Sequence, residues 1–128
     1  MIVLDEQLGD ARIASDISRW YKGTVIPVKQ LRPRTRIFDD VVPSLLRSAR
    51  QPTFITINYK DFWKKIPASP DYCVVCFKIS QGQVDELSDL LRRVLSLPGL
   101  RTKRERMGAV VSVVDRKVAV YRDWNLPS

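Results

Sequence analysis

Short apolar runs alternate along this chain with segments in which apolar residues recur at helical spacing. The runs with the length and β-branched content of buried strands are residues 1–4, 24–28, 53–57 and 72–79. The segments with helical periodicity are residues 7–20, 38–49 and 84–94. Strands joined by helices form right-handed crossovers and a mainly parallel sheet with helices on both faces. The alternation therefore predicts an α/β protein with three layers, α/β/α.

The end of the chain departs from this alternation. Residues 108–114 and 117–122 are two further strand-like runs, separated only by Asp115 and Arg116. A two-residue connection predicts a C-terminal β-hairpin that adds an antiparallel edge strand. A chain of 128 residues is long enough for one core and too short for two independent ones. Residues 1–128 are therefore expected to form a single domain.

The charge and the residue types present limit the chemistry. The net charge of +8, from 22 basic and 14 acidic residues, favours polyanionic partners such as RNA, DNA or an acidic protein segment. The sequence contains no histidine, which excludes Ser-His-Asp and Cys-His nucleophilic sites and general acid/base catalysis by histidine. Hydrolysis by this chain would have to use carboxylates, a metal ion or lysine.

Two features bear on location. No apolar run approaches the roughly 20 residues that a transmembrane helix needs. The first residues lack the basic and apolar regions of a signal peptide. We therefore expect a cytoplasmic protein that does not enter a membrane.

Cys73 and Cys76 form a C-x-x-C pattern inside the apolar run at residues 72–79. Residues three apart on a strand point to opposite faces of the sheet. The two thiols therefore neither bind one metal ion nor form a disulfide there, and zinc would need further ligands that the chain lacks. The pattern predicts buried core cysteines.

Acidic and amide side chains stand where predicted strands end and where the second helix begins. They are Asp5 and Glu6, Asp39 and Asp40, and Asn58 and Asp61. Strand ends gather in one crevice of an open α/β sheet, so these side chains can share a Mg²⁺ or Mn²⁺ ion. An acid at a helix start also caps the helix and favours its dipole, which is an alternative for each of them taken singly.

Basic residues lie on both sides of these acids in the sequence. They are Lys29, Arg32, Arg34 and Arg36, and after the third strand Lys60, Lys64 and Lys65. A phosphate backbone could follow such clusters across a metal site, and Tyr59, Phe62 or Trp63 could stack on bases if exposed. The alternative is a solvated charged loop. A denser basic stretch, Arg101, Lys103, Arg104 and Arg106, favours a charged surface loop, and antitoxin docking or nonspecific attraction of RNA is the alternative.

Together these residues resemble PIN-like ribonuclease domains of the small bacterial type that serve as toxins of toxin-antitoxin pairs. The resemblance spans nearly the whole chain. Its carriers are a strand followed by Asp5-Glu6, Asp40 at the start of an amphipathic helix, Thr56-Ile57-Asn58 followed by Asp61-Phe62, and the closing hairpin.

The resemblance implies a metal-dependent endoribonuclease. Asp5, Asp40 and Asp61 would bind Mg²⁺ or Mn²⁺, with Glu6, Asp39 and Asn58 completing the catalytic site. Arg32, Arg34, Arg36, Lys60 and Lys64 would contact RNA, and a cognate antitoxin protein would be the partner. The chain departs from the family pattern in two ways: Asn58 stands where an aspartate is expected, and one more residue precedes Asp61.

A second interpretation follows from these departures. A catalytically silent PIN-like module that binds RNA or protein through its basic surface fits the same pattern, and fold resemblance alone does not separate the two. The sequence also leaves open a homodimer formed through the apolar helices.

Overall fold

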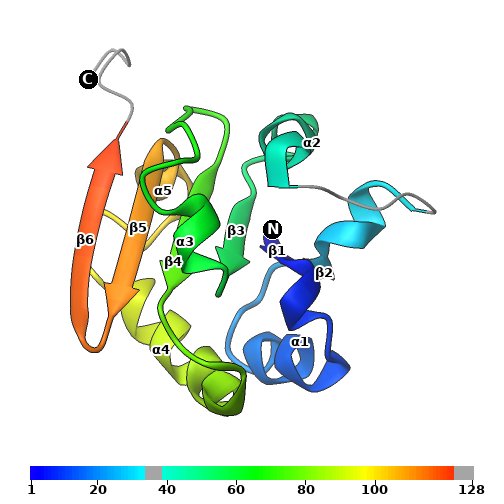
Figure 1. The fold of residues 1–128 in the computed structure, drawn as a ribbon, viewed down its shortest axis with the longest axis vertical. Helices are drawn as coiled ribbons and strands as arrows, with labels where there is room; N and C mark the ends of the chain where they lie inside the picture. Colours follow the sequence, from blue (N-terminus) through cyan, green and yellow to red (C-terminus); the bar gives the residue numbers. More distant parts are fainter. Residues whose placement is uncertain (34–38, 123–128) are drawn as a thin grey trace.

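The computed structural model describes residues 1–33 and 39–122, and a six-stranded sheet runs through all of this part (Figure 1). The strands are β1 (Ile2–Leu4), β2 (Val25–Pro27), β3 (Thr53–Thr56), β4 (Cys73–Phe77), β5 (Ala109–Val114) and β6 (Lys117–Arg122). Their order across the sheet is β2-β1-β3-β4-β5-β6. All neighbours pair in parallel except β5 and β6, which are antiparallel. The predicted α/β class with a mainly parallel sheet is confirmed.

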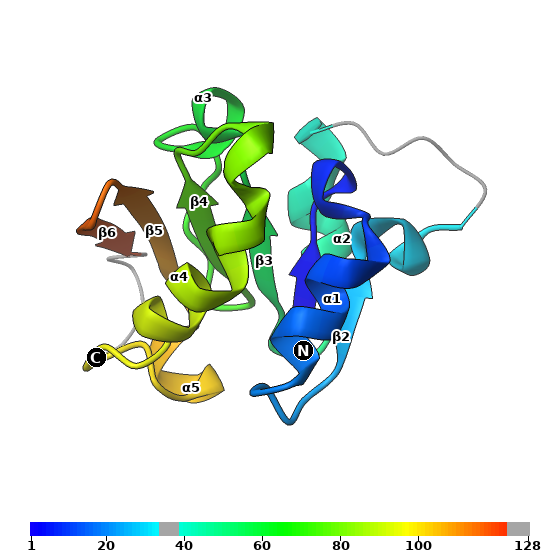
Figure 2. The same cartoon turned by 90° about the horizontal axis from the view of Figure 1, so that it is seen from below.

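Helices pack on both faces of the sheet (Figure 2). They are α1 (Ala11–Ser18), α2 (Val42–Ser48), α3 (Tyr59–Phe62), α4 (Leu87–Val94) and α5 (Lys103–Arg106). Shorter 3₁₀ turns are η1 (Glu6–Leu8), η2 (Val28–Leu31), η3 (Asp39–Val41) and η4 (Gln81–Glu86). One core cluster joins α1 and α4 to the sheet, and the other joins α2 and α3 to its opposite face. This arrangement is compatible with the predicted three layers.

The two-residue alternation of each strand divides its side chains between these clusters. On β4, Cys73 packs in the α1 and α4 cluster, while Cys76 packs in the α2 and α3 cluster. Both are free, buried thiols, and burial raises the pKa of each to about 12. The prediction of buried core cysteines on opposite faces is confirmed.

Some predicted element boundaries were wrong. The helix expected at residues 7–20 is broken into η1 and α1, because the Asp10 side chain accepts the Arg12 N–H and starts α1 at Ala11. The helix expected at residues 84–94 begins with the 3₁₀ turn η4, and the turn expected after β3 contains α3. Phe38, expected to begin the second helix, lies outside the described residues.

The hairpin connection has the geometry that its sequence predicts. β5 and β6 pair from Val114 and Lys117 outward, with Asp115 and Arg116 as the loop. Asp115 has φ 56°, a left-handed conformation that aspartate tolerates better than most residues.

No helix in residues 1–33 and 39–122 is long and apolar enough to cross a membrane.

The strand order positions the functional site. β1 lies between β2 and β3, and the chain passes from β1 to β2 through α1 on one face and from β2 to β3 through α2 on the other. In doubly wound sheets, ligands bind outside the carboxyl ends of the strands where the direction of winding reverses. The crevice expected from this rule lies beyond Leu4 and Thr56.

Candidate metal centre

The carboxyl ends of β1 and β3 bring three separate chain segments to one edge of the sheet. Figure 2 shows this edge above the strands, with α3 and the turns η1 and η3 around it. Asp5 follows β1, Asp39 begins η3, and Asp61 lies in α3. These three residues, far apart in the sequence, therefore lie at the same edge of the sheet, where the fold predicts a ligand site.

Asp5 is the buried member of this group, with 6% of its surface exposed. The Thr56 hydroxyl donates to its Oδ2 at 2.6 Å, and the Glu6 N–H donates to its Oδ1 at 2.8 Å. Burial raises the pKa of Asp5, although both hydrogen bonds oppose this shift. Asp5 also caps η1, so the predicted capping role and a role in the site coexist in one side chain.

Thr56 connects Asp5 to the next segment. Its hydroxyl oxygen accepts the Asn58 N–H at 2.9 Å, and the Asn58 side-chain amide donates to Asp39 Oδ2 at 3.2 Å. A continuous chain of hydrogen bonds thus runs from Asp5 through Thr56 and Asn58 to Asp39. The side-chain amide of Asn58 orients Asp39 by this bond. An aspartate at position 58 would instead have added a negative charge.

Asp39 is the residue on which the acidic charges act together. Its pKa is raised by partial burial first and then by the charges of Asp5 and Asp61. A hydrogen bond with Asp61 and the charge of Glu6 raise the pKa further. Asp39 and Asp61 thus lie near each other, and a cation would relieve the repulsion between two such carboxylates.

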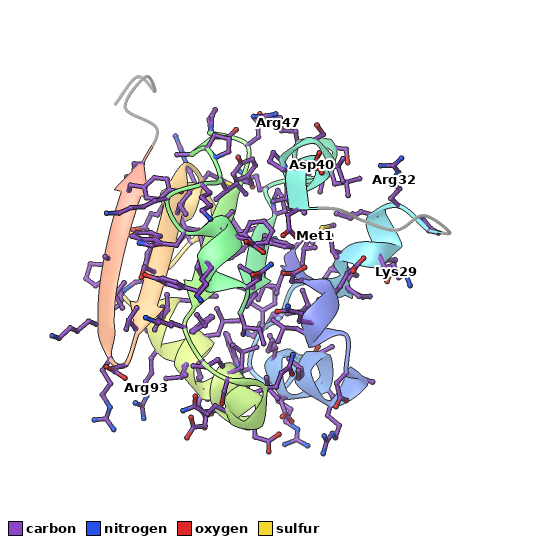
Figure 3. All side chains as sticks on the ribbon, viewed as in Figure 1. Met1, Lys29, Arg32, Asp40, Arg47 and Arg93 are labelled. Atoms are coloured by element: carbon purple, nitrogen blue, oxygen red, sulfur yellow. The ribbon has the colours of Figure 1, made fainter. Side chains whose placement is uncertain are left out.

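Asp40 lies in η3, just before α2 begins (Figure 3). With Asp39, Asp61 and Lys65 it lines a shallow hollow of about 420 Å³. Within residues 1–33 and 39–122, no three Asp, Glu or Cys side chains converge closely enough to hold one metal ion together. The structure links Asp5 and Asp61 through Asp39, whereas the resemblance assigned that place to Asp40.

The donor set fits a hard divalent cation. Mg²⁺ is usually held by one or two carboxylates and keeps several of its waters. Asp39 and Asp61 offer two neighbouring carboxylates, and Asp5 adds a further negative charge close to them. Two ligands of this kind satisfy the ordinary requirement for Mg²⁺ or Mn²⁺.

The predicted RNA contacts are only partly described. Lys29 and Arg32 are exposed on and after η2 and point away from the sheet (Figure 3). Lys60 and Lys64 are exposed in and after α3. Arg34 and Arg36 lie outside the described residues.

Phe62 does not meet the condition for stacking on bases, because this ring is 1% exposed and packs against Phe54. Tyr59 and Trp63 are half-buried. Tyr59 bonds the Ser112 hydroxyl at 2.8 Å, and Trp63 packs between the rings of Tyr59 and Tyr121. These rings hold α3 on the sheet, which keeps Asp61 in place.

Sequence reasoning missed the role of Thr56 and misjudged Arg106. Thr56 lies on the same face of β3 as Phe54, and its place as a polar residue at the end of the strand was the available signal. Arg106 is 2% exposed, although it was expected on a charged surface loop. The residues before it, Lys103, Arg104 and Glu105, are charged and exposed, so the basic stretch itself did not separate it from them.

Comparison of this chain with protein-family models, with curated proteins and with solved structures finds no significant match.

Proposed function

We propose that this chain is a PIN-like, Mg²⁺- or Mn²⁺-dependent endoribonuclease whose ion is held by Asp39 and Asp61. The observation that carries the proposal is the chain of hydrogen bonds that joins Asp5, Thr56, Asn58 and Asp39 at the carboxyl ends of β1 and β3, where the charges of Asp5 and Asp61 also raise the pKa of Asp39. Carboxylates that repel one another at a strand-end crevice favour a cation at that point. Without histidine, cation-assisted hydrolysis is the route to phosphodiester cleavage that these side chains support best.

The roles of the side chains follow from their contacts. When bound, a divalent ion supplies a polarised phosphate oxygen and an activated water. Asp39 and Asp61 hold the ion, and the Asn58 amide fixes the rotamer of Asp39 by its 3.2 Å hydrogen bond. Asp5, fixed by Thr56 and Glu6, contributes negative charge from beneath. Exposed Lys60, Lys64 and Lys65 attract the phosphate backbone to the site.

The choice of RNA as substrate rests on the net charge of +8 and on the PIN-like resemblance. The same resemblance carries the proposal that the chain is a toxin held inactive by an antitoxin protein. Co-purification of a protein encoded beside this chain, and release of cleavage when that protein is removed, would support the toxin role. Cleavage that the neighbouring protein leaves unchanged would contradict it.

One observation favours a second candidate, a silent module that binds RNA or protein. Asn58 donates a proton to Asp39, where an aspartate would add charge for a metal ion. A weaker ion site follows, since Mg²⁺ affinity depends on the number of carboxylates. In this candidate the acidic edge is retained for structure, and the basic residues carry the binding.

The test is cleavage of a labelled single-stranded RNA by the purified chain with Mn²⁺, with Mg²⁺ and with EDTA. We expect metal-dependent cleavage that Asp39→Asn and Asp61→Asn each reduce by about 100-fold or more, because each removes a direct ligand. Asp5→Asn should also reduce it. Asp40→Asn should keep most of the activity, and Asp115→Asn, at the distant hairpin, should keep all of it.

Thermal unfolding separates the two candidates. An ion that binds only the folded chain stabilises it by about 1.4 kcal/mol at ten times its dissociation constant. The nuclease requires that about 1 mM Mn²⁺ raise the Tm of the wild type and leave that of Asp39→Asn unchanged. RNA binding without cleavage and without a Mn²⁺ shift would instead establish the silent module. Full cleavage by Asp39→Asn would overturn the assigned ion site.

A further inference from the structure

A second hollow lies at the opposite, amino-terminal edge of the sheet. It is an open hollow with a volume of about 540 Å³, lined by the α1–β2 connection, the end of α4 and the segment around α5. These elements lie together at the lower edge of Figure 2, where the N-terminus is marked. The carboxylates described above are at the other end of the strands. The hollow is therefore a separate feature.

Basic side chains from three segments meet in this hollow. They are Lys22, Arg92, Arg101, Lys103 and Arg106. No acidic residue is among the described residues that line it. The ion pairs of the described chain, Arg12 with Asp10 and Arg19 with Asp16, involve none of the five. Five positive charges without a counterion create a strong local attraction for an anion.

Arg106 is the buried member of the five, with 2% of its surface exposed. Its Nε donates to Thr53 Oγ1 at 2.7 Å, and its Nη1 donates to the carbonyls of Leu100 and Arg101 at 3.2 and 3.4 Å. These acceptors are neutral, so the buried positive charge has no carboxylate partner in the described chain. A buried charge without its opposite is costly, and a bound anion would offset that cost.

The second guanidinium nitrogen, Nη2, is left for such an anion. It makes no hydrogen bond within the described residues, yet no fully buried side-chain nitrogen there lacks a partner. Nη2 therefore reaches the surface, and Arg106 lines the hollow. Three neutral acceptors thus hold the rest of the group and orient one N–H pair toward the ligand space.

Aromatic rings form another wall of the hollow. Trp20 and Tyr21 meet edge to face with their centroids 6.1 Å apart, and Trp20 is fixed by a 2.9 Å bond from its Nε1 to Ser88. A Cβ on Gly23 would lie 2.6 Å from the Tyr21 ring, so only glycine gives the ring its space there. Aromatic faces beside cations are the usual partners of a nucleobase and its phosphates.

Electrostatics at Tyr21 agree with this placement. Burial, and then the charges of Lys103 and Arg106, lower the pKa of the Met1 amine to about 6. This amine lies 3.2 Å from the Tyr21 hydroxyl. The positive potential of the two side chains therefore extends to the aromatic wall.

We propose that this hollow binds a nucleotide, with its phosphates on Lys103, Arg101 and Arg106 and its base beside Trp20 and Tyr21. Pockets for small ligands have volumes of roughly 300–1,000 Å³, a range that includes this hollow. Phosphate oxygens accept the charge-assisted hydrogen bonds that arginine and lysine supply. The nucleotide can be free or the 5′-phosphorylated end of an RNA, since both present the same groups. The site does not depend on the carboxylates at the other edge.

The experiment is calorimetric titration in EDTA, which removes any contribution of a divalent ion at the carboxylates. The probes are ADP, inorganic pyrophosphate, and a short RNA with either a 5′-phosphate or a 5′-hydroxyl. We expect ADP to bind more tightly than pyrophosphate because only ADP has a base for the aromatic wall. If the RNA end is the natural ligand, the 5′-phosphorylated RNA binds more tightly than ADP; if a free nucleotide is, ADP binds more tightly.

Matched variants test where the nucleotide binds. Arg101→Gln with Lys103→Gln removes two cations of the hollow, and ADP affinity should fall by about 10-fold or more. Arg93→Gln with Arg104→Gln removes the same charge from positions outside it, and affinity should fall less than about twofold. Gly23→Ala should weaken ADP and leave pyrophosphate nearly unchanged.

Three outcomes would overturn the proposal. They are no binding of ADP or of the phosphorylated RNA, equal losses in the two double variants, and equal affinities for ADP and pyrophosphate. Circular dichroism spectra of the variants that match the wild type keep a loss of binding distinct from a loss of fold. Failure here leaves the ion site at the other edge untouched, because Mn²⁺ stabilisation and RNA cleavage test that site separately.

Discussion

The two ends of β3 carry the same residue type and opposite electrostatics. At the amino end the Thr53 hydroxyl accepts a hydrogen bond from buried Arg106, and at the carboxyl end the Thr56 hydroxyl donates one to buried Asp5. The two threonines are separated by roughly 10 Å of extended chain. β3 thus bonds the buried cation Arg106 at one end and the buried anion Asp5 at the other. The two charges are too far apart to form an ion pair.

The alternation of side chains along the strand explains this separation. Ile55 packs with α1 and α4, whereas Phe54 packs with α2 and α3. Thr53 shares the face of Ile55, and Thr56 shares the face of Phe54. The two buried charges therefore differ in both edge and face: Thr56 contacts Asp5 on the side of α2 and α3, and Thr53 contacts Arg106 on the side of α1 and α4. A short strand can keep two polar sites apart because it changes face at each residue.

The largest effect that we predict is at the amino end. Arg106→Ala should lower the free energy of unfolding by about 2–4 kcal/mol, because it leaves Thr53 and two carbonyls without their donor and opens a cavity. Arg104→Ala, on the exposed side of the same helix, should change it by no more than about 0.5 kcal/mol. Urea denaturation measures both. If Arg106→Ala and Arg104→Ala have equal, small effects, the buried hydrogen bonds of Arg106 do not stabilise the fold. The contrast drawn between the two ends of β3 would then be wrong.

A smaller effect distinguishes the two threonines. Thr53→Val and Thr56→Val keep the side-chain shape and remove a hydroxyl, so each should cost about 1–2 kcal/mol at neutral pH. Below neutrality their behaviour should differ. The Thr56 hydroxyl stabilises ionised Asp5, so the cost of Thr56→Val should shrink as acid protonates this carboxyl.

The Thr53 hydroxyl bonds a guanidinium and no carboxyl, so the cost of Thr53→Val should stay constant. Urea denaturation at neutral pH and near pH 4 gives the four values needed. A cost of Thr56→Val that does not fall in acid would mean that the hydroxyl does not support the charged form of Asp5.

Much of the fold was predictable because it depends on local patterns. Periodicity located the strands, and the two residues Asp115 and Arg116 located the hairpin. Strand alternation placed Cys73 and Cys76 on opposite faces. The break between η1 and α1 was missed because a capping bond from Asp10 interrupts a continuous apolar pattern.

The site was less predictable because it depends on how segments meet. The sequence identified the acids at the strand ends, but Asp39 and Asp40 are neighbours and no periodicity chooses between them. The choice is made by the start of η3, which turns Asp39 toward Asn58 and Asp61. Arg106 shows the same limit at the other edge, because it is buried where its guanidinium reaches Thr53 on β3, a contact between segments far apart in the sequence.

The smallest effect concerns the choice between Asp39 and Asp40. Partial burial and the charges of Asp5 and Asp61 raise the pKa of Asp39 above the ordinary value of 3.8. A raised pKa means that ionised Asp39 costs more in the folded than in the unfolded chain. Its contribution to stability is therefore complete below the ordinary value and is lost as the pH rises through the folded pKa. In EDTA at neutral pH, Asp39→Asn should stabilise the chain, by less than about 1 kcal/mol because the site is open to solvent.

Addition of Mn²⁺ should reverse the sign of this difference. The wild type would then gain the binding energy of the ion and become more stable than Asp39→Asn, because one carboxylate of the pair is missing from the variant. Asp40→Asn serves as the matched control, since it removes one charge from the adjacent position. If Asp40→Asn instead abolishes the Mn²⁺ shift while Asp39→Asn retains it, the ion lies in the outer hollow, as the PIN-like resemblance implies. If both variants retain the shift, Asp5 and Asp61 hold the ion without either of them, and the acidic edge centres on β1 and β3 alone.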